Sequence, residues 1–244
     1  MKWLSFMPWR SLALAAAALA VAAAPEIVGL LRLDQSAVLG GEIWRLWTGH
    51  LVHGSAQHLA WNVAALIGLG FLFERAIGRN FTALVLIGGA VVGAGVFVLQ
   101  PEIDTYLGLS GVLNTIWVGG AVIAARGERG WMRAVYFVAV AAGLSKILFE
   151  AWTGLSIFTD PGALGGRPLV LAHALGSLAG CAILSLDGPA EPRPPRLRRT
   201  AFRSRTCRSE PGPARLQDAV LRIESVTVLG DVGDRQVIES SRSR

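Results

Sequence analysis

Two polar residues in apolar stretches, Ser110 and His173, have the side chains that nucleophilic catalysis requires. A serine hydroxyl is a weak nucleophile until a base within hydrogen-bond distance takes its proton, and an imidazole can be that base. Ser110 lies in the motif GLSG, whose glycines, Gly108 and Gly111, allow another backbone or an extended substrate to come close. Taken alone, such a serine is also typical of helix packing, with its hydroxyl bonded back to a carbonyl group. Whether Ser110 is a nucleophile therefore depends on whether His173 lies within reach.

The residues that follow His173 indicate where its side chain points. Gly176 and Gly180 lie three and seven residues further on, so the three share one stripe of a helix. A second stripe of small residues follows Ser110 and consists of Gly111, Thr115 and Gly119. Small residues let helix backbones approach closely. If these two stripes pack together, the His173 ring can reach the Ser110 hydroxyl.

A second polar pair, His58 and Asn62, is separated by four residues and therefore occupies one helix face. Both side chains can donate to a developing oxyanion, together with the backbone N–H of Ser110. The alternative is a structural pair satisfied by neighbouring carbonyl groups. His50 and His53 stand just upstream, but no carboxylate is interspersed and the spacing matches no metal-ligand pattern, so we expect no metal.

An acidic partner for His173 is not evident from the sequence. Glu150 is the nearest candidate, but it follows Lys146 by four residues, and this spacing indicates an ion pair at a helix end. The sequence therefore predicts a Ser–His dyad rather than a triad, without a cofactor.

The composition places these residues in a membrane protein. Of the 244 residues 52% are hydrophobic and 16% are charged, with a mean hydropathy of +0.49, whereas soluble domains carry about 25% charged residues. A membrane helix needs about 20 mostly apolar residues. Six such stretches are predicted, at residues 11–33, 57–73, 81–99, 107–125, 131–153 and 168–186. We expect an all-α membrane protein with a six-helix bundle over residues 1–187.

The first stretch has a second interpretation, because Lys2 and Arg10 precede an Ala/Leu run as in a signal peptide. Pro25 is a poor start for a mature chain, however. Apolar residues resume at 27–33, so we expect this stretch to be retained and to span the membrane.

The loop charges alternate along the chain and predict the orientation. Lys and Arg near membrane spans tend to stay on the cytoplasmic side. One set of loops carries Lys2, Arg10, Arg75, Arg79, Arg126, Arg129, Arg133 and the arginine-rich tail. The other set carries fewer basic residues (Arg32, Arg45 and Arg167) among Asp34, Glu42, Glu102, Asp104 and Asp160. Both termini are therefore predicted to be cytoplasmic.

The last segment, residues 188–244, differs in class from the rest. It holds 12 arginines and 7 acidic residues, a net charge of +5 out of +6 for the chain. It begins with a Pro/Arg-rich run and lacks sustained apolar periodicity up to residue 215, which predicts a disordered cytoplasmic tail. Residues 220–229 then alternate in a pattern that is compatible with one short strand or amphipathic element, which has little to pack against. Aromatic residues do not alternate with these arginines, so we expect no nucleic-acid partner. Arginines beside a membrane can bind anionic lipid headgroups, but a solvated tail without a role in catalysis is the favoured interpretation.

The motifs, in this order, resemble the rhomboid intramembrane serine proteases. The matching features are GxSG opening the fourth stretch, HxxxN in the second, AHxxGxxxG in the sixth and the Trp44–Arg45 pair in the first loop. The resemblance covers about residues 41–186 and implies the six-helix rhomboid fold. It implies Ser110 as nucleophile, His173 as general base and an oxyanion site formed by His58, Asn62 and the Ser110 amide. It also implies substrate positioning at Gly108 and Gly111, and structural roles for Trp44, Arg45, Gly176 and Gly180.

Within that family the chain looks like the rhombosortase subgroup, on the runs EIWRLWTGHLVHGSAQHLAWN and YLGLSGVLN. This resemblance implies a bacterial inner-membrane enzyme whose site opens to the periplasm. Its partners would be membrane-anchored envelope proteins with a C-terminal Gly-Gly, transmembrane and Arg-rich sorting signal. Asn114 departs from the histidine that the subgroup favours, which bears on substrate preference more than on catalysis.

Three alternatives stay open at this point: a general rhomboid protease with other single-span substrates, a non-catalytic rhomboid relative that binds client helices, and a small transporter. The presence of both Ser110 and His173 disfavours the second. The transporter is disfavoured because the stretches show neither paired repeats nor runs of acidic residues.

Overall fold

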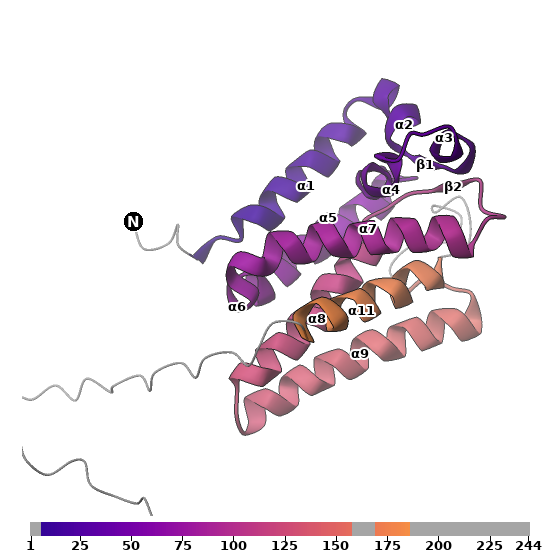
Figure 1. The fold of residues 1–244 in the computed structure, drawn as a ribbon. Coiled ribbons are helices and arrows are strands. Elements are labelled where there is room, and N and C mark those ends of the chain that lie inside the picture. Colours follow the sequence, from indigo (N-terminus) through magenta and orange to yellow (C-terminus); the bar gives the residue numbers. More distant parts are fainter. Residues whose placement is uncertain (1–5, 158–168, 186–244) are drawn as a thin grey trace, which may run out of the picture. The chain divides into compact units, whose positions relative to one another are not determined.

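Residues 6–157 and 169–185 are described by the computed structural model, and most of them are helical (Figure 1). The longer helices are α1 (Trp9–Ala22), α5 (Ala56–Leu69), α7 (Phe81–Leu99), α8 (Ser110–Gly127), α9 (Trp131–Thr153) and α11 (Val170–Ser185). The shorter ones are α2 (Pro25–Leu31), α3 (Gln35–Leu39), α4 (Arg45–Thr48) and α6 (Arg75–Ile77). Three helical turns join them: η2 (Gly49–Leu51), η3 (Gly70–Glu74) and η4 (Gly78–Asn80). The sequence prediction missed one small sheet, in which β1 (Leu33–Asp34) pairs antiparallel with β2 (Thr105–Tyr106).

The apolar stretches predicted most of these helices. The bounds of α7 and α9 agree with the prediction, and those of α8 and α11 differ by at most three residues. The six-span count remains a prediction. Among the described residues, Ala56–Leu99 and Trp131–Thr153 are long and apolar enough to cross a membrane. The first of these is interrupted at Gly78, whose φ of +66° separates α5 from α7. The predicted tail, residues 188–244, lies outside the described residues.

The first predicted span, residues 11–33, is wrong as one straight helix. It is divided into α1 and α2, which meet at an angle of 110°. The break follows from Pro25, which starts α2 and disfavours helical geometry at the residue before it. Ala24 accordingly has φ −124° and ψ 73°. The apolar residues after Pro25 therefore do not extend α1, although α1 and α2 taken together are long and apolar enough to cross a membrane.

Helices α8 and α11 pack closely, as their stripes of small residues predict. A Cβ atom on Gly119 would lie 2.9 Å from the Cα of Gly180, and one on Gly111 would lie 3.1 Å from the carbonyl oxygen of Ala172. Since real Cβ atoms rarely come so close, these glycines are required for the helices to meet at this separation. This contact brings the beginning of α8 next to the beginning of α11.

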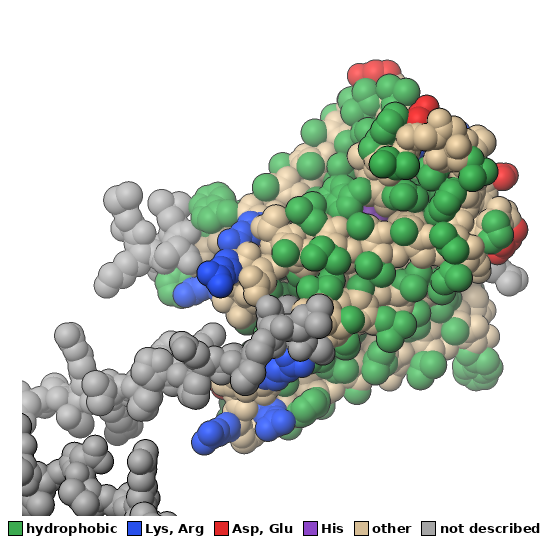
Figure 2. Space-filling view, viewed as in Figure 1, with side chains coloured by type: hydrophobic (Ala, Val, Ile, Leu, Met, Phe, Trp, Pro, Cys, Tyr) green, Lys and Arg blue, Asp and Glu red, His purple; other side chains and the backbone are tan. Residues whose placement is uncertain are grey.

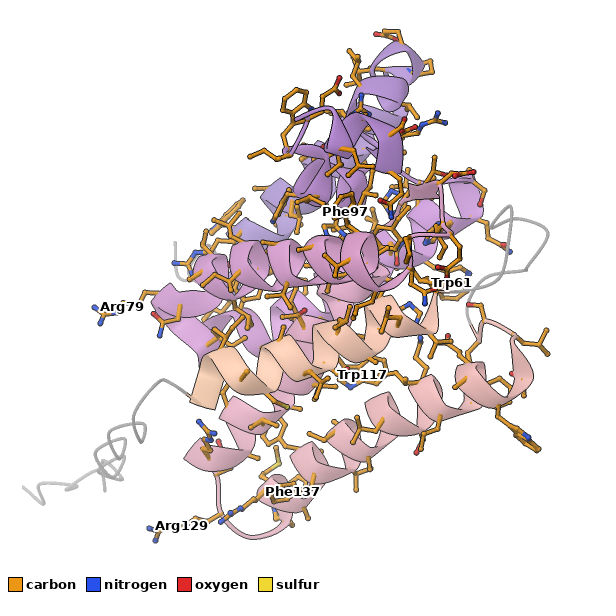
Figure 3. The ribbon with its side chains drawn as sticks, turned by 45° about the vertical axis from the view of Figure 1, so that its right-hand side comes forward. Trp61, Arg79, Phe97, Trp117, Arg129 and Phe137 are labelled. Atoms are coloured by element: carbon orange, nitrogen blue, oxygen red, sulfur yellow. The ribbon has the colours of Figure 1, made fainter. Side chains whose placement is uncertain are left out.

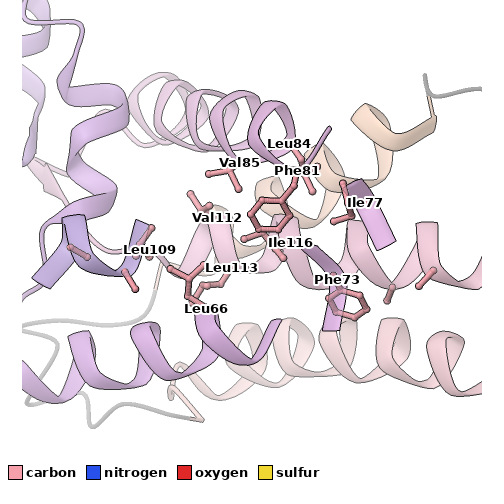
Figure 4. Packing of buried hydrophobic residues seen from close by; sticks show 14 residues of the cluster. Leu66, Phe73, Ile77, Phe81, Leu84, Val85, Leu109, Val112, Leu113 and Ile116 are labelled. Carbon is pink, nitrogen blue, oxygen red and sulfur yellow. The ribbon is translucent and has the colours of Figure 1, made fainter. Parts of the chain in front are cut away.

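The apolar core joins α8 to the helices on its other side. Figure 4 shows Phe81 and Leu84 of α7 facing Ile116 of α8, with Leu66 of α5 near Leu113. Each of these side chains is at most 6% exposed. Burying a large apolar side chain stabilises a fold by about 1.5–3 kcal/mol in water; within a bilayer, close packing replaces much of that contribution. The core thus holds α8 at the centre of the bundle.

Charged side chains gather at two different ends of the described bundle. Figure 2 shows arginine at the end that carries α6 and the α8–α9 turn, and acidic side chains near α2, α3 and β2. In Figure 3, Arg79 and Arg129 both point outward at the basic end. The charge alternation that the sequence predicts is thereby present in the folded chain.

Candidate active site

The predicted reactive residues line one pocket. It has a volume of about 1030 Å³, and its walls include Ser110, His173, His58 and Asn62. Ser110 begins α8, His173 lies in the first turn of α11, and His58 and Asn62 lie in the first two turns of α5. Three helices that are distant in sequence therefore place their polar residues together.

The turn before Ser110 depends on Gly108. Its φ is +110°, a region that residues with side chains rarely adopt. A Cβ atom at this position would also lie 2.6 Å from Cε1 of His58. Gly108 N–H donates to the carbonyl oxygen of Gly49 at 3.1 Å. These contacts fix where α8 begins, and the first N–H groups of a helix have no partner within it. The Ser110 amide is therefore available to an incoming oxygen.

His50 supports this turn, a role that the sequence prediction did not assign. The ring is fully buried, with Nε2 2.9 Å from the carbonyl oxygen of Gly89 and Nδ1 3.2 Å from that of Gly108. Burial lowers the pKa of His50. A neutral ring donates to one of the two carbonyls at a time and joins α7 to the turn before Ser110.

His58 and Asn62 keep unpartnered polar atoms in the pocket. Each side chain is 6% exposed, yet within the described ranges His58 Nδ1 and Asn62 Nδ2 have no hydrogen-bond partner. Buried polar atoms are normally paired, so unpaired ones at a pocket wall suit a ligand. The Ser55 hydroxyl accepts from the His58 N–H at 3.1 Å and caps α5. This cap fixes the first turn and hence the direction of both side chains.

His53 packs against His58 and is not among the residues that line the pocket. The two rings meet edge to face with centroids 5.0 Å apart. Burial and the neighbouring His58 lower the pKa of His53 to about 4. Among the described residues, no group of three or more His, Cys, Asp and Glu side chains is placed to hold a metal ion.

A carboxylate lies beside His173, which the sequence prediction did not expect. His173 Nδ1 lies 2.7 Å from Oε2 of Glu150, and both side chains are almost fully buried. Lys146 also pairs with Glu150, with Nζ 2.7 and 2.8 Å from its two oxygens. The ion pair between Lys146 and Glu150 that the sequence predicts is therefore confirmed. The expectation that Glu150 would not also contact His173 is wrong. Spacing along α9 identifies the ion pair but not which side of α9 faces α11.

Asn114 adds a polar atom that the site prediction did not include. Its amide nitrogen donates to the carbonyl oxygen of Ser110 at 2.8 Å, one turn back in α8. This bond fixes the direction of the amide, and its Oδ1 atom is left buried at the pocket wall without a partner among the described residues. The pocket thus offers an acceptor as well as donors.

Trp44 and Arg45 lie away from the pocket and hold the first loop together. Arg45 is 5% exposed and donates to Glu42 Oε2 at 2.6 Å and to the carbonyl oxygens of Gly29 and Arg32 at 2.7 and 3.0 Å. These bonds satisfy the carbonyl group of Gly29, in the last turn of α2, and that of Arg32, which follows α2. The Trp44 indole donates to the carbonyl oxygen of Leu30 at 3.4 Å.

Comparison with known proteins gives two matches. The family model described as "Rhomboid domain" matches residues 40–189, which include every residue of the pocket. A protein of Bacillus subtilis (strain 168) named "Putative rhomboid protease YdcA" is 32% identical over 77 residues. That alignment covers 31% of this chain and 39% of the relative, so it spans about two fifths of that protein.

Proposed function

Because the chain belongs to the rhomboid family of intramembrane serine proteases, we propose that it is itself a serine endopeptidase that cleaves membrane-anchored proteins. One observation carries the proposal: Ser110 and His173 lie in the first turns of two helices that pack through glycines, and both line the pocket that also holds His58 and Asn62. A nucleophile, a base and hydrogen-bond donors around one cavity are the groups that acyl transfer needs.

The proposed reaction proceeds in two steps. Ser110 Oγ attacks the scissile carbonyl carbon while His173 Nε2 takes the hydroxyl proton. The C–N bond then breaks as this proton passes to the leaving amine. Asn62, His58 and the Ser110 amide donate to the oxyanion during attack, and one such donor contributes about 10²–10³ in rate. In the second step water attacks the acyl-enzyme with His173 again as the base, which releases the product and restores Ser110.

The rest of the pocket fits a membrane-anchored substrate. From the polar end it continues along apolar and small residues of α5, α8 and α9: Trp61, Ala64, Ala65, Gly68, Trp117 and Ala139. Trp117 belongs to α8 and lies above α9 in Figure 3, and its indole donates to the carbonyl oxygen of Ala139 in α9 at 3.0 Å. An apolar anchor would lie along this wall while an extended segment reaches Ser110. The substrate must be unwound there, because a helical carbonyl is already hydrogen-bonded.

The finer proposal is a rhombosortase in a bacterial inner membrane, with both termini cytoplasmic and the site open to the periplasm. The sequence runs around Trp44 and Ser110 support the subgroup, and the basic end of the bundle supports the orientation. We propose that the substrate carries a C-terminal Gly-Gly, transmembrane and Arg-rich signal. The alternatives are other single-span substrates or client binding without cleavage.

A reporter carrying such a signal tests the function. Ser110→Ala and His173→Ala variants, expressed at wild-type levels, are expected to stop its release. Labelling by a serine-directed phosphonate probe should likewise be lost in Ser110→Ala. Release by Ser110→Ala would overturn the protease assignment. Replacing Gly-Gly by Leu-Leu separates the subgroup from a general protease, since only the rhombosortase would fail to cleave it.

A further inference from the structure

Glu150 is the feature of the pocket that the Ser–His reaction leaves unused. Its side chain is inaccessible to solvent, and Lys146 and His173 bond to it from two different helices. The inference that follows rests on the proposed function. We propose that Glu150 is a positioning residue that converts the Ser110–His173 pair into a Ser–His–Glu triad, with Lys146 as its counterion.

Hydrogen-bond chemistry assigns the His173 tautomer. An ionised carboxylate only accepts hydrogen bonds, so the 2.7 Å contact from His173 Nδ1 to Glu150 Oε2 requires the proton to be on Nδ1. Lys146 Nζ is further from this nitrogen, at 3.5 Å, and therefore does not compete effectively for it. In a neutral ring Nε2 then keeps its lone pair. This is the tautomer that can take a proton from Ser110 Oγ.

Charge balance supports the same assignment. Lys146 and Glu150 neutralise each other at 2.7 Å, and the Lys146 side chain is 11% exposed. A neutral His173 leaves this buried group uncharged overall, whereas a resting imidazolium would add an unbalanced charge. During attack His173 becomes an imidazolium, and the adjacent carboxylate stabilises it. No proton moves to Glu150, because Nδ1–H stays on the ring throughout.

Position along α9 also distinguishes this carboxylate from an ordinary helix-end ion pair. Lys146 and Glu150 are one turn apart on the same face, which turns toward the pocket. Most large apolar side chains of α9 are instead exposed on other faces, including Trp131, Val138, Leu148 and Trp152. A surface pair would serve solubility. This pair instead lies on the side of α9 that faces α11 and the cavity.

Glu150→Gln tests the proposal, because a glutamine amide can donate to Nδ1 and favour the other tautomer. Cleavage of a membrane-anchored reporter by the full-length protein in detergent micelles should show kcat lowered about 10²–10⁴-fold, with KM unchanged. The rate constant of phosphonate labelling should fall in parallel, while the fraction of protein finally labelled stays at the wild-type value. Glu150→Asp should recover part of kcat.

Two controls separate positioning from folding. Glu74→Gln changes another buried glutamate that lies outside the pocket, and its kcat should stay within threefold of wild type. The double variant Lys146→Met/Glu150→Gln removes the unpaired lysine charge and should show the same loss of kcat as Glu150→Gln. A structural role alone would lower the labelled fraction and leave the rate constant of the folded molecules unchanged.

The ¹⁵N spectrum of the wild-type protein gives a readout that needs no folded Glu150 variant. The chain has four histidines, so His173 can be assigned by comparison with His173→Asn. Protonated Nδ1 and unprotonated Nε2 are expected. A proton on Nε2, or a kcat of Glu150→Gln within threefold of wild type, would overturn the positioning role. Either result would leave the protease assignment standing, since that depends on Ser110→Ala.

Discussion

Glu74 and Glu150 are both buried carboxylates, but they bond to different kinds of partner. Glu74 ends η3 beside α6, and Glu150 lies in the last turn of α9. Glu74 accepts from the Arg10 and Ser11 backbone N–H groups, each at 3.0 Å, and from the Ser11 hydroxyl at 2.8 Å. Glu150 accepts from Lys146 and His173, both ionisable side chains.

The hydrogen-bond partners of Glu74 indicate that this carboxylate has a structural role. Pro8 precedes α1 and makes no side-chain cap, so the first N–H groups of that helix need another acceptor. Glu74 supplies it from a segment more than 60 residues away in sequence. A carboxylate at a helix N-terminus is also favoured by the helix dipole. Burial of an acid is therefore no sign of chemistry by itself; the ionisable partners at Glu150 are what distinguish it.

The largest effect on stability is expected from Glu150→Leu. This variant leaves Lys146 buried without its counterion, which costs about 3–5 kcal/mol in the free energy of unfolding. The double variant Lys146→Met/Glu150→Leu removes both charges and should recover most of that loss. Unfolding by SDS titration from mixed micelles measures both. If the double variant were as unstable as Glu150→Leu, the apolar side chains would not substitute for the ion pair. The Lys146–Glu150 pair would then be required for packing.

A loss of activity without a loss of stability is expected from Asn62→Leu. This change removes an oxyanion donor, so kcat should fall about 10²–10³-fold. Asn62 Nδ2 has no partner among the described residues, so its removal should leave the free energy of unfolding unchanged or higher. Reporter cleavage measures kcat and SDS unfolding measures the free energy of unfolding, both on the same preparation. A clear loss of stability would mean that the amide serves the fold, as Glu74 does.

The sequence was sufficient to place most helices and to pair two of them. The apolar stretches located α7, α8, α9 and α11, and the glycine stripes predicted that α8 and α11 meet. These features are encoded locally, in the length and periodicity of one segment. The bend at Pro25 could also have been read locally, since proline disfavours helical geometry in the residue before it.

The contact between Glu150 and His173 could not be read in the same way. It depends on how α9 is rotated about its axis, and the four-residue spacing to Lys146 already gave Glu150 a sufficient partner. One physical signal was present, because a charged pair inside an apolar helix is costly to bury unless it serves a further contact. The structural role of Glu74 was missed for a related reason. Two of its donors are backbone N–H groups, which every residue except proline has, so no residue type indicates the contact.

Glu74→Gln is expected to weaken the fold and leave catalysis intact. The amide keeps one acceptor, so at least one of the three donors from Arg10 and Ser11 loses its partner. An unsatisfied buried donor costs about 1–3 kcal/mol in the free energy of unfolding. Labelling by the phosphonate probe should proceed at the wild-type rate. A slower rate in the folded fraction would show that the α1 end is coupled to the pocket and would remove the distinction between the two glutamates.

The smallest effect is expected from Ser11→Ala, which removes one of the three bonds to Glu74. The hydroxyl contact at 2.8 Å is lost, but the two backbone bonds remain. A hydrogen bond to a charged group contributes about 1.5–3 kcal/mol, and the alanine also leaves a small gap that Gly70 adjoins. Because Glu74 stays paired, the loss in the free energy of unfolding should be near the lower bound, about 1.5 kcal/mol.

SDS unfolding of the single variants and of Ser11→Ala/Glu74→Gln forms a double-mutant cycle. Additive losses would show that the hydroxyl acts independently of the carboxylate, and a smaller combined loss is expected because the Ser11 hydroxyl bonds directly to the carboxylate that Glu74→Gln replaces.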